Sequence, residues 1–180
     1  MKVKIAQIQA HVYEEKSKNL EELERVKQEC MQLVNKRALL SGAAAAVPLP
    51  GVDISADITI MVELLTEINK RFGLSEEQIG QLDLERKKVL LVIISSVGNE
   101  LAGKTVSATV VRSLLKKVSS RIAARQVSRF VPLMGQAVSA GISFAAMRYL
   151  GRNHVNQCYQ IALRYMSQID VRFTSDVIDI

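Results

Sequence analysis

The segment VPLPGVDISADI at residues 47–58 has a close copy, VPLMGQAVSAGI, at residues 131–142. Both follow the pattern V-P-L-x-G-x-x-[IV]-S-A-x-I, and helix-forming residues flank each copy. Proline cannot continue a helix and glycine supplies a permissive backbone, so each copy is expected to end one helix and begin another. The Ser-Ala pair after each break is small enough for another backbone to approach closely. The sequence therefore predicts two pseudo-repeated helix-break-helix units that pack against each other.

The composition favours helices packed through aliphatic side chains. The chain has 180 residues, aromatic residues make up 4% of it, and tryptophan is absent. A core of Ala, Val, Ile, Leu and Met suits close-packed helices better than a sandwich or barrel, and the length is that of one domain. We therefore expect an all-α, multi-helix bundle of about six helices in a single domain, residues 1–180. It would comprise an N-terminal amphipathic helical segment (1–38), a helical core (39–169) and a tail (170–180).

Apolar periodicity and capping residues locate the first predicted helices. Apolar residues at three- and four-residue spacing predict a long helix over residues 5–38, with a break near residues 17–19. Asp53 and Asp83 are predicted N-caps, and the SEEQ sequence that starts at Ser75 has the form of a capping box.

The second half of the chain is also predicted to be helical. The apolar run at residues 89–94 contains β-branched residues, which favour strands, but no second strand exists to pair with it. We therefore assign this run to a helix. A basic helix over residues 105–129 follows, and the last predicted helix ends near residue 169, with an extended or frayed tail after Asp170.

No residue pattern points to a catalytic or metal site. Asp53 and Asp57 lie one turn apart, but acidic residues at a helix start are expected from the helix dipole alone. The two histidines, at positions 11 and 154, have no neighbouring cluster of ligands in the sequence. Cys30 and Cys158 are the only cysteines, and no signal peptide is evident, so we expect a reduced, cytoplasmic protein without a cofactor.

Basic side chains dominate one region of the chain. Residues 101–169 hold ten basic and no acidic side chains, whereas residues 1–100 hold 13 basic and 15 acidic ones. A long region with one sign of charge attracts anionic surfaces. The candidates are anionic lipid, nucleic acid, or the acidic first half of a second copy of the chain, as in a homo-oligomer.

The basic region is predicted to form a winding positive band on one helix. The candidate residues for binding a membrane or a partner are Arg112, Lys116, Lys117, Arg121, Arg125 and Arg129. A face that is merely solvated usually mixes both signs of charge. Near an anionic membrane each basic residue contributes on the order of 1 kcal/mol. Nucleic acid is disfavoured as a partner because aromatic stacking residues and a recognition motif are both absent.

An alternative hypothesis is nucleotide binding by GNELAGKT at residues 98–105, which satisfies G-x-x-x-x-G-K-[ST]. In a phosphate-binding loop, Gly98 and Gly103 would permit the turn, Lys104 would contact phosphate and Thr105 would hold magnesium. Glu100 would place a carboxylate beside the phosphate, however. The sequence also offers no parallel strands to hold such a loop. The favoured interpretation is a connection between two helices.

A second alternative is a small membrane-inserting hairpin protein. Residues 130–147 are uncharged and lie between Arg129 and Arg148, but the segment is short for a membrane span and contains Pro132 and Gly135. A buried helix, packed through small residues against the matching helix after Pro50, is the favoured interpretation.

Residues 38–74, ALLSGAAAAVPLPGVDISADITIMVELLTEINKRFGL, resemble the C-terminal helical domain of the immunity-related GTPases. They are also similar to a bacterial family of uncharacterised membrane-associated helical proteins. The matching features are the alanine-rich approach, VPLPG at 47–51, Asp57, and FGL at 72–74. FVPLMG at 130–135, with Ser143 and Phe144, resembles the second break of that domain. The likeness covers roughly residues 27–166.

This resemblance implies a helical bundle that accompanies, orients or membrane-tethers a GTP-hydrolysing domain. We expect the GTPase domain itself to be absent, and the G-x-x-x-x-G-K-T match lies where the family has no nucleotide site. The resemblance therefore carries over no GTPase activity and no catalytic residue. The expected function is a non-enzymatic helical module that associates through its basic second half with an anionic membrane surface, a partner GTPase, or both. It would be cytoplasmic and peripheral at the membrane.

Overall fold

The computed structural model describes the backbone of residues 2–45, 53–99, 101–126 and 135–178, and side chains over 14–43, 56–99, 101–122 and 141–169. Within these ranges the chain is entirely helical apart from its connections, and no strand is present. The all-α prediction is therefore confirmed. The helices are α1 (Lys2–Ala45), α2 (Asp53–Arg71), α3 (Glu76–Gly80), α4 (Leu84–Val97), α5 (Ala108–Gln126) and α6 (Gly135–Ile178).

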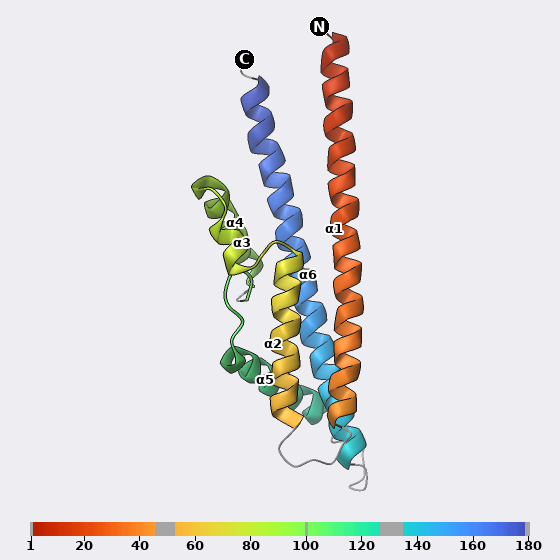
Figure 1. The fold of residues 1–180 in the computed structure, drawn as a ribbon. Coiled ribbons are helices and arrows are strands. Elements are labelled where there is room, and N and C mark those ends of the chain that lie inside the picture. Colours follow the sequence, from red (N-terminus) through yellow and green to blue (C-terminus); the bar gives the residue numbers. More distant parts are fainter. Residues whose placement is uncertain (1, 46–52, 100, 127–134, 179–180) are drawn as a thin grey trace.

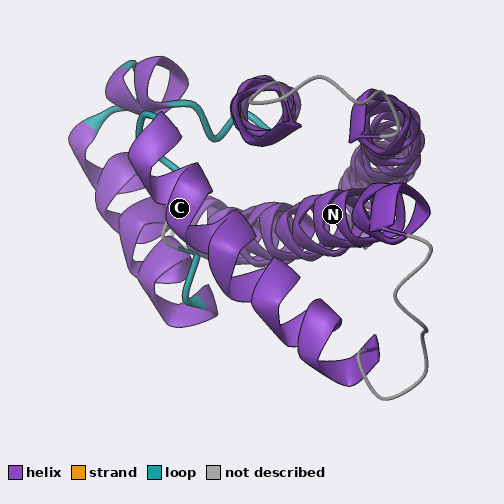
Figure 2. Ribbon diagram, turned by 90° about the horizontal axis from the view of Figure 1, so that it is seen from below, coloured by secondary structure: helices purple, strands orange, loops and turns teal. Residues whose placement is uncertain are grey.

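Two long antiparallel helices, α1 and α6, form the spine of the bundle (Figure 1). Helix α2 lies beside them and packs against both, whereas α4 packs against α6 farther toward the C-terminal end of that helix. Helix α5 runs across α6 and α2 rather than along them, as the end-on view in Figure 2 also shows. One surface of α5 is thereby held against the bundle, and the opposite surface faces away from it.

The core is aliphatic, as the composition predicts. Helix α6 contributes a stripe of fully buried residues at three- and four-residue spacing, and α1 and α2 contribute the stripes that face it. The largest fully buried side chains are Met61, Leu64, Leu65, Ile68, Met147 and Ile161. Because these side chains come from α2 and α6, the centre of the bundle lies where those two helices meet α1.

Gly151 sets how closely α6 approaches the other two helices. A Cβ atom at this position would lie 2.8 and 2.9 Å from the two methyl carbons of Val34 on α1, and 3.3 Å from Leu64 Cδ2 on α2. Distances this short are not found between carbon atoms in contact, so the site accepts only glycine without rearrangement.

The local signals for helix ends are confirmed. Ser75 and Gln78 form the predicted capping box, and the Asp83 side chain accepts a hydrogen bond from the Arg86 amide (2.9 Å). Gly98 ends α4 in the left-handed conformation with φ +72°. The apolar run at residues 89–94 is helical, as predicted from its lack of a partner strand.

Four predicted helix boundaries are wrong. The first helix, predicted over residues 5–38, extends from Lys2 to Ala45. Helix α1 shows no break at residues 17–19, where the Glu14–Lys18 ion pair (2.9 Å) bridges one helical turn. The tail predicted after Asp170 is helical to Ile178, since no glycine or proline interrupts the sequence after Gly151. Helix α5 begins at Ala108, not at residue 105, because the Ser107 hydroxyl caps it by accepting from the Val110 amide (3.4 Å).

The two V-P-L-x-G breaks fall largely outside the described residues, at 46–52 and 127–134. The helix ends that flank them are the end of α1, the start of α2, the end of α5 and the start of α6. All four lie at the same end of the bundle (Figure 1). The pseudo-repeat itself remains a prediction.

The close approach at Gly151 can be tested by adding one methyl group. We expect Gly151→Ala to lower the free energy of unfolding by about 1–2 kcal/mol, because the methyl group overlaps the buried and rotamerically stiff Val34. Gly141→Ala on the same helix is the control. That position is open, so alanine should raise stability by up to about 1 kcal/mol. Urea unfolding of both variants measures the difference, and equal stabilisation by both would contradict the packing described here.

Candidate functional site

Four of the six predicted basic residues lie exposed on α5. They are Arg112, Lys116, Lys117 and Arg121, and the apolar residues Val111, Leu115 and Val118 on the opposite side of the helix are buried. Arg125 belongs to α5 by its backbone, but its side chain lies outside the described residues, as does all of Arg129. The structure therefore places a set of exposed cations on the outward surface of α5.

The winding band predicted from the spacing stays a prediction, because the side chains of Arg125 and Arg129 lie outside the described residues. Successive residues of a helix are about 100° apart, so Arg112 and Lys116 lie on one flank of the exposed half of α5. Lys117 and Arg121 lie on the other flank. The two pairs border the outward surface of the helix on both sides.

Ion pairs between described side chains occupy a different part of the molecule. All of them lie between residues 14 and 88. Arg112, Lys116, Lys117 and Arg121 make no ion pair with any side chain that the structure describes. Within the described side chains, the carboxylates of the first half therefore do not fold over α5.

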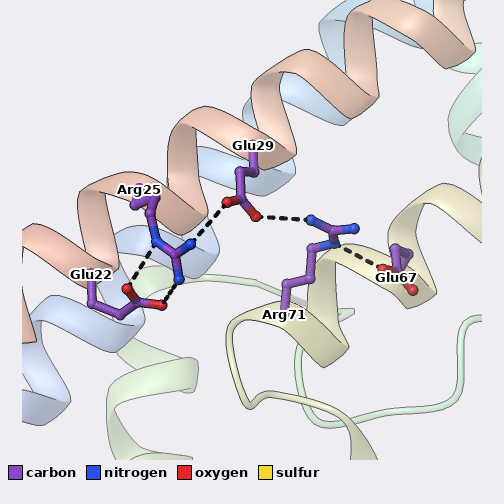
Figure 3. A network of polar contacts seen from close by, with 5 residues as sticks. All are labelled: Glu22, Arg25, Glu29, Glu67 and Arg71. Atoms are coloured by element: carbon purple, nitrogen blue, oxygen red, sulfur yellow. Dashed lines mark hydrogen bonds and ion pairs between the residues drawn. The ribbon is translucent and has the colours of Figure 1, made fainter.

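The largest ion-pair network joins α1 to α2 (Figure 3). Arg25 contacts Glu22 (2.5 Å) and Glu29 (3.5 Å), and Arg71 contacts Glu29 (3.2 Å) and Glu67 (2.8 Å). The hydrogen bond from Arg25 lowers the pKa of Glu22, and the hydrogen bond to Glu67 raises the pKa of Arg71. In this network the carboxylates of Glu22, Glu29 and Glu67 are therefore paired with arginines of α1 and α2.

The Gly98–Thr105 segment connects two helices rather than a strand and a helix. The Asn99 Oδ1 atom accepts hydrogen bonds from the amides of Leu101 (2.9 Å) and Ala102 (3.0 Å). The Gly103 amide donates to the Leu74 carbonyl (2.9 Å). The amides of Leu101, Ala102 and Gly103 are thus engaged within the protein instead of being free to bind a phosphate, which favours the interpretation as a connection.

Lys104 and Thr105 border a pocket of about 440 Å³ that has mixed charge. Lys70 and Lys104 line it together with Glu76 and Glu77, and the Thr105 hydroxyl donates to Glu76 Oε2 (2.6 Å). The carboxylates of Glu76 and Glu77 would repel a polyphosphate in this pocket. The Thr105 hydroxyl is already hydrogen-bonded to Glu76 and is not free to bind magnesium. The geometry of the pocket does not favour a magnesium nucleotide.

A buried polar cluster links α2, the α4–α5 connection and α6, and sequence reasoning missed it. Its members are Asn69, Asn99, His154 and Cys158, all buried. Asn99 Nδ2 lies 3.4 Å from His154 Nδ1, and His154 Nε2 lies 2.9 Å from Asn69 Oδ1. Asn69 Nδ2 in turn donates to the Leu101 carbonyl (3.0 Å). The i, i+4 spacing of His154 and Cys158 on α6 was visible in the sequence, but the asparagines come from distant segments.

Burial sets the protonation state of this cluster. It lowers the pKa of His154 to about 4, so the imidazole is neutral near pH 7. The Asn99 amide donor lies beside Nδ1 and the Asn69 carbonyl oxygen lies beside Nε2, an arrangement that favours the neutral tautomer with its proton on Nε2. Burial also raises the pKa of Cys158, and it raises the pKa of Cys30 to about 11. Both thiols therefore stay protonated and are poor nucleophiles despite the nearby histidine.

Of the two acidic residues considered in the sequence, Asp57 makes a contact within the protein and Asp53 lies outside the described side chains. The Ser41 hydroxyl donates to the Asp57 carboxylate and ties α1 to α2, whereas the side chain of Asp53 is not described. Among the described residues, no group of three or more His, Cys, Asp or Glu side chains could hold a metal ion. No helix in the described part of the chain is both long enough and apolar enough to cross a membrane. The predicted uncharged segment at 130–147 is only partly described.

The buried histidine predicts a loss of stability in acid. The pKa of His154 is about 4 in the folded state and near its ordinary value of 6.5 in the unfolded chain. Between these values the unfolded state binds more protons, so stability is complete above about pH 6.5 and falls as the pH drops toward 4. We expect a loss on the order of 3 kcal/mol across this window.

Urea unfolding at several pH values measures this loss, with His154→Gln as the matched variant. The variant is expected to be less stable at pH 7 but to lose less stability on acidification, because His11 is then the only histidine left. Parallel pH profiles for the two proteins would show that His154 is not the titrating group.

The engaged amides at Gly98–Thr105 predict that nucleotides do not stabilise the protein. We expect the midpoint of thermal unfolding to be unchanged by millimolar magnesium complexes of GTP, GDP, ATP or ADP, since a ligand of the native state would raise it. A rise that Lys104→Ala abolishes would contradict this expectation. It would restore the nucleotide-binding hypothesis.

Comparison with known proteins links the chain to the immunity-related GTPases. It is 27% identical over 147 residues to interferon-inducible GTPase 5 from Rattus norvegicus and 26% identical over 147 residues to the protein of that name from Bos taurus. Each alignment covers 81% of this chain and 32% of the relative, so the chain spans about a third of the length of the curated relatives it matches. No protein-family model matches the chain. No solved structure matches it either.

Proposed function

We propose that this chain is a non-enzymatic helical module that associates with an anionic membrane surface through the outward surface of α5. The observation that carries the proposal is the exposure of Arg112, Lys116, Lys117 and Arg121 without a carboxylate partner among the described side chains. Basic side chains on ordinary protein surfaces are usually interspersed with acidic ones. Residues 101–169 contain none, so the positive potential of α5 is not neutralised locally.

The distribution of the four cations suits a flat anionic surface. A helix that lies on a membrane presents its outward half to the plane of headgroups, and long basic side chains on both flanks can reach down to them. The two pairs on α5 have this arrangement. At about 1 kcal/mol for each residue near an anionic surface, four cations would contribute on the order of 4 kcal/mol. This contribution would fall as salt screens the surface.

The similarity to GTPases also supports a second possible partner for the basic surface of α5, namely a GTPase. The chain is similar to part of proteins named interferon-inducible GTPases, which is consistent with a helical module that accompanies a GTPase domain. A partner GTPase that offers an acidic surface would use the same cations. The membrane form is the one we argue, because a flat surface engages both flanks of α5 at once.

The proposal predicts that binding to vesicles depends on the charge of the lipid and of α5. Four neutralising substitutions, Arg112→Gln, Lys116→Gln, Lys117→Gln and Arg121→Gln, are expected to weaken binding to phosphatidylserine vesicles about a hundredfold or more at low salt. Flotation of the protein with phosphatidylserine or neutral phosphatidylcholine vesicles at two salt concentrations measures the effect.

A matched control changes the net charge equally at basic residues outside α5. It carries Lys18→Gln, Arg25→Gln, Lys36→Gln and Lys88→Gln, all at exposed positions of the first half. We expect this control to retain most of the binding. Equal weakening by both sets, or binding that ignores lipid charge, would contradict the role of α5.

A further inference from the structure

An exposed aromatic side chain lies beside the basic surface of α5. Tyr149 on α6 is 60% exposed, and its ring borders a pocket of about 140 Å³ formed with Val118, Ile122 and Arg121 of α5. Its hydroxyl makes no hydrogen bond with a described residue, unlike that of Tyr159, which donates to Glu24. The pocket therefore combines apolar side chains, a guanidinium that pairs with no described carboxylate, and a solvent-exposed phenol.

Other exposed groups extend this patch. Arg148 and Arg152 lie exposed on the same outward side of α6 as Tyr149, within one turn of it. On α5, the 40% exposed Val110 shares the flank of Lys117 and Arg121. Apolar and cationic groups thus alternate over adjoining parts of two helices, and residues 101–169 contribute no acidic side chain to oppose an anion.

Tyrosine has an apolar ring and a polar tip, a combination that is stable where hydrocarbon meets water. Arginine binds a phosphate group with several donors in a fixed plane. The surroundings of Tyr149 therefore match the boundary between phosphate headgroups and acyl chains in an anionic bilayer. A water-filled site for a small soluble anion would have no use for the exposed ring.

We infer that Tyr149 is an apolar anchor that enters the interfacial layer of an anionic phospholipid membrane while Arg121 contacts a lipid phosphate. The inference rests on the proposed function and adds a specific contact to it. The cations of α5 supply attraction that salt weakens. Tyr149 supplies burial of apolar surface, which salt does not weaken. The two contributions can therefore be separated.

The absence of tryptophan from the chain allows a direct test. Tyr149→Trp introduces the only tryptophan of the chain at the proposed anchor, and the exposed position should accept it without loss of stability. We expect its emission to shift to shorter wavelength when phosphatidylserine vesicles are added, and lipids brominated in their acyl chains to quench it. Leu84→Trp on α4, at a position that is 67% exposed, is the control and should show neither effect.

The possible outcomes distinguish this inference from the proposed function. Salt-sensitive vesicle binding together with a shift confined to position 149 supports both. If the protein binds anionic vesicles but the tryptophan at position 149 stays in water, or if position 84 responds equally, the anchor is refuted and the proposed function stands. If wild-type protein does not bind anionic vesicles, both fail.

A second variant measures the apolar contribution without a probe. Tyr149→Ser is expected to reduce binding to phosphatidylserine vesicles about tenfold, by a factor that is the same at low and high salt. An unchanged affinity, with thermal unfolding also unchanged, would overturn the anchor. The variant Leu84→Ser serves as the control and should bind like the wild-type protein.

Discussion

The packing of α6 against α1, α2, α4 and α5 is the constraint on which the rest of the structure depends. The middle of α6 is buried on several sides, and Gly151 is what allows α1 and α2 to approach it together. Helix α5 packs against the bundle through one face and exposes four described cations, whereas α6 exposes Arg148, Arg152 and Arg164 only where its neighbours leave it uncovered.

Charge is segregated because acids and bases of the first half satisfy one another. The Glu22–Arg25–Glu29–Arg71–Glu67 network joins α1 to α2, and Arg37 pairs with Glu63 (3.1 Å) across the same interface. Each of these pairs is exposed enough that its contribution to stability is small. These pairs matter more for where the charge lies, because they hold four carboxylates at the interface between α1 and α2. The carboxylates are those of Glu22, Glu29, Glu63 and Glu67. The four exposed cations of α5, by contrast, make no ion pair with a described side chain.

Local signals in the sequence predicted the parts of the fold that local interactions determine. The capping box at Ser75 and the cap at Asp83 act within one turn, and both were predictable. The continuous α1 and the long α6 were not, because polar sequence around residue 17 and residue 170 is compatible with either a helix or a break. For the candidate site, the sequence identified the cations, but the exposure of Tyr149 depends on where α5 crosses α6. The asparagine–histidine cluster had no signal, because its members meet only after folding.

The buried asparagine–histidine cluster also anchors the connection that leads into α5, although it does not contact the outward surface of that helix. Asn99 holds the amides of Leu101 and Ala102, Asn69 holds the Leu101 carbonyl, and Leu74 holds the Gly103 amide. The connection that leads into α5 is thus attached to α2 and α6 at several points within a few residues. Hydrogen bonds are directional, whereas aliphatic packing alone would tolerate a sliding or rotated α5. These hydrogen bonds hold the connection that precedes α5, and the buried Val111, Leu115 and Val118 hold α5 itself against the bundle.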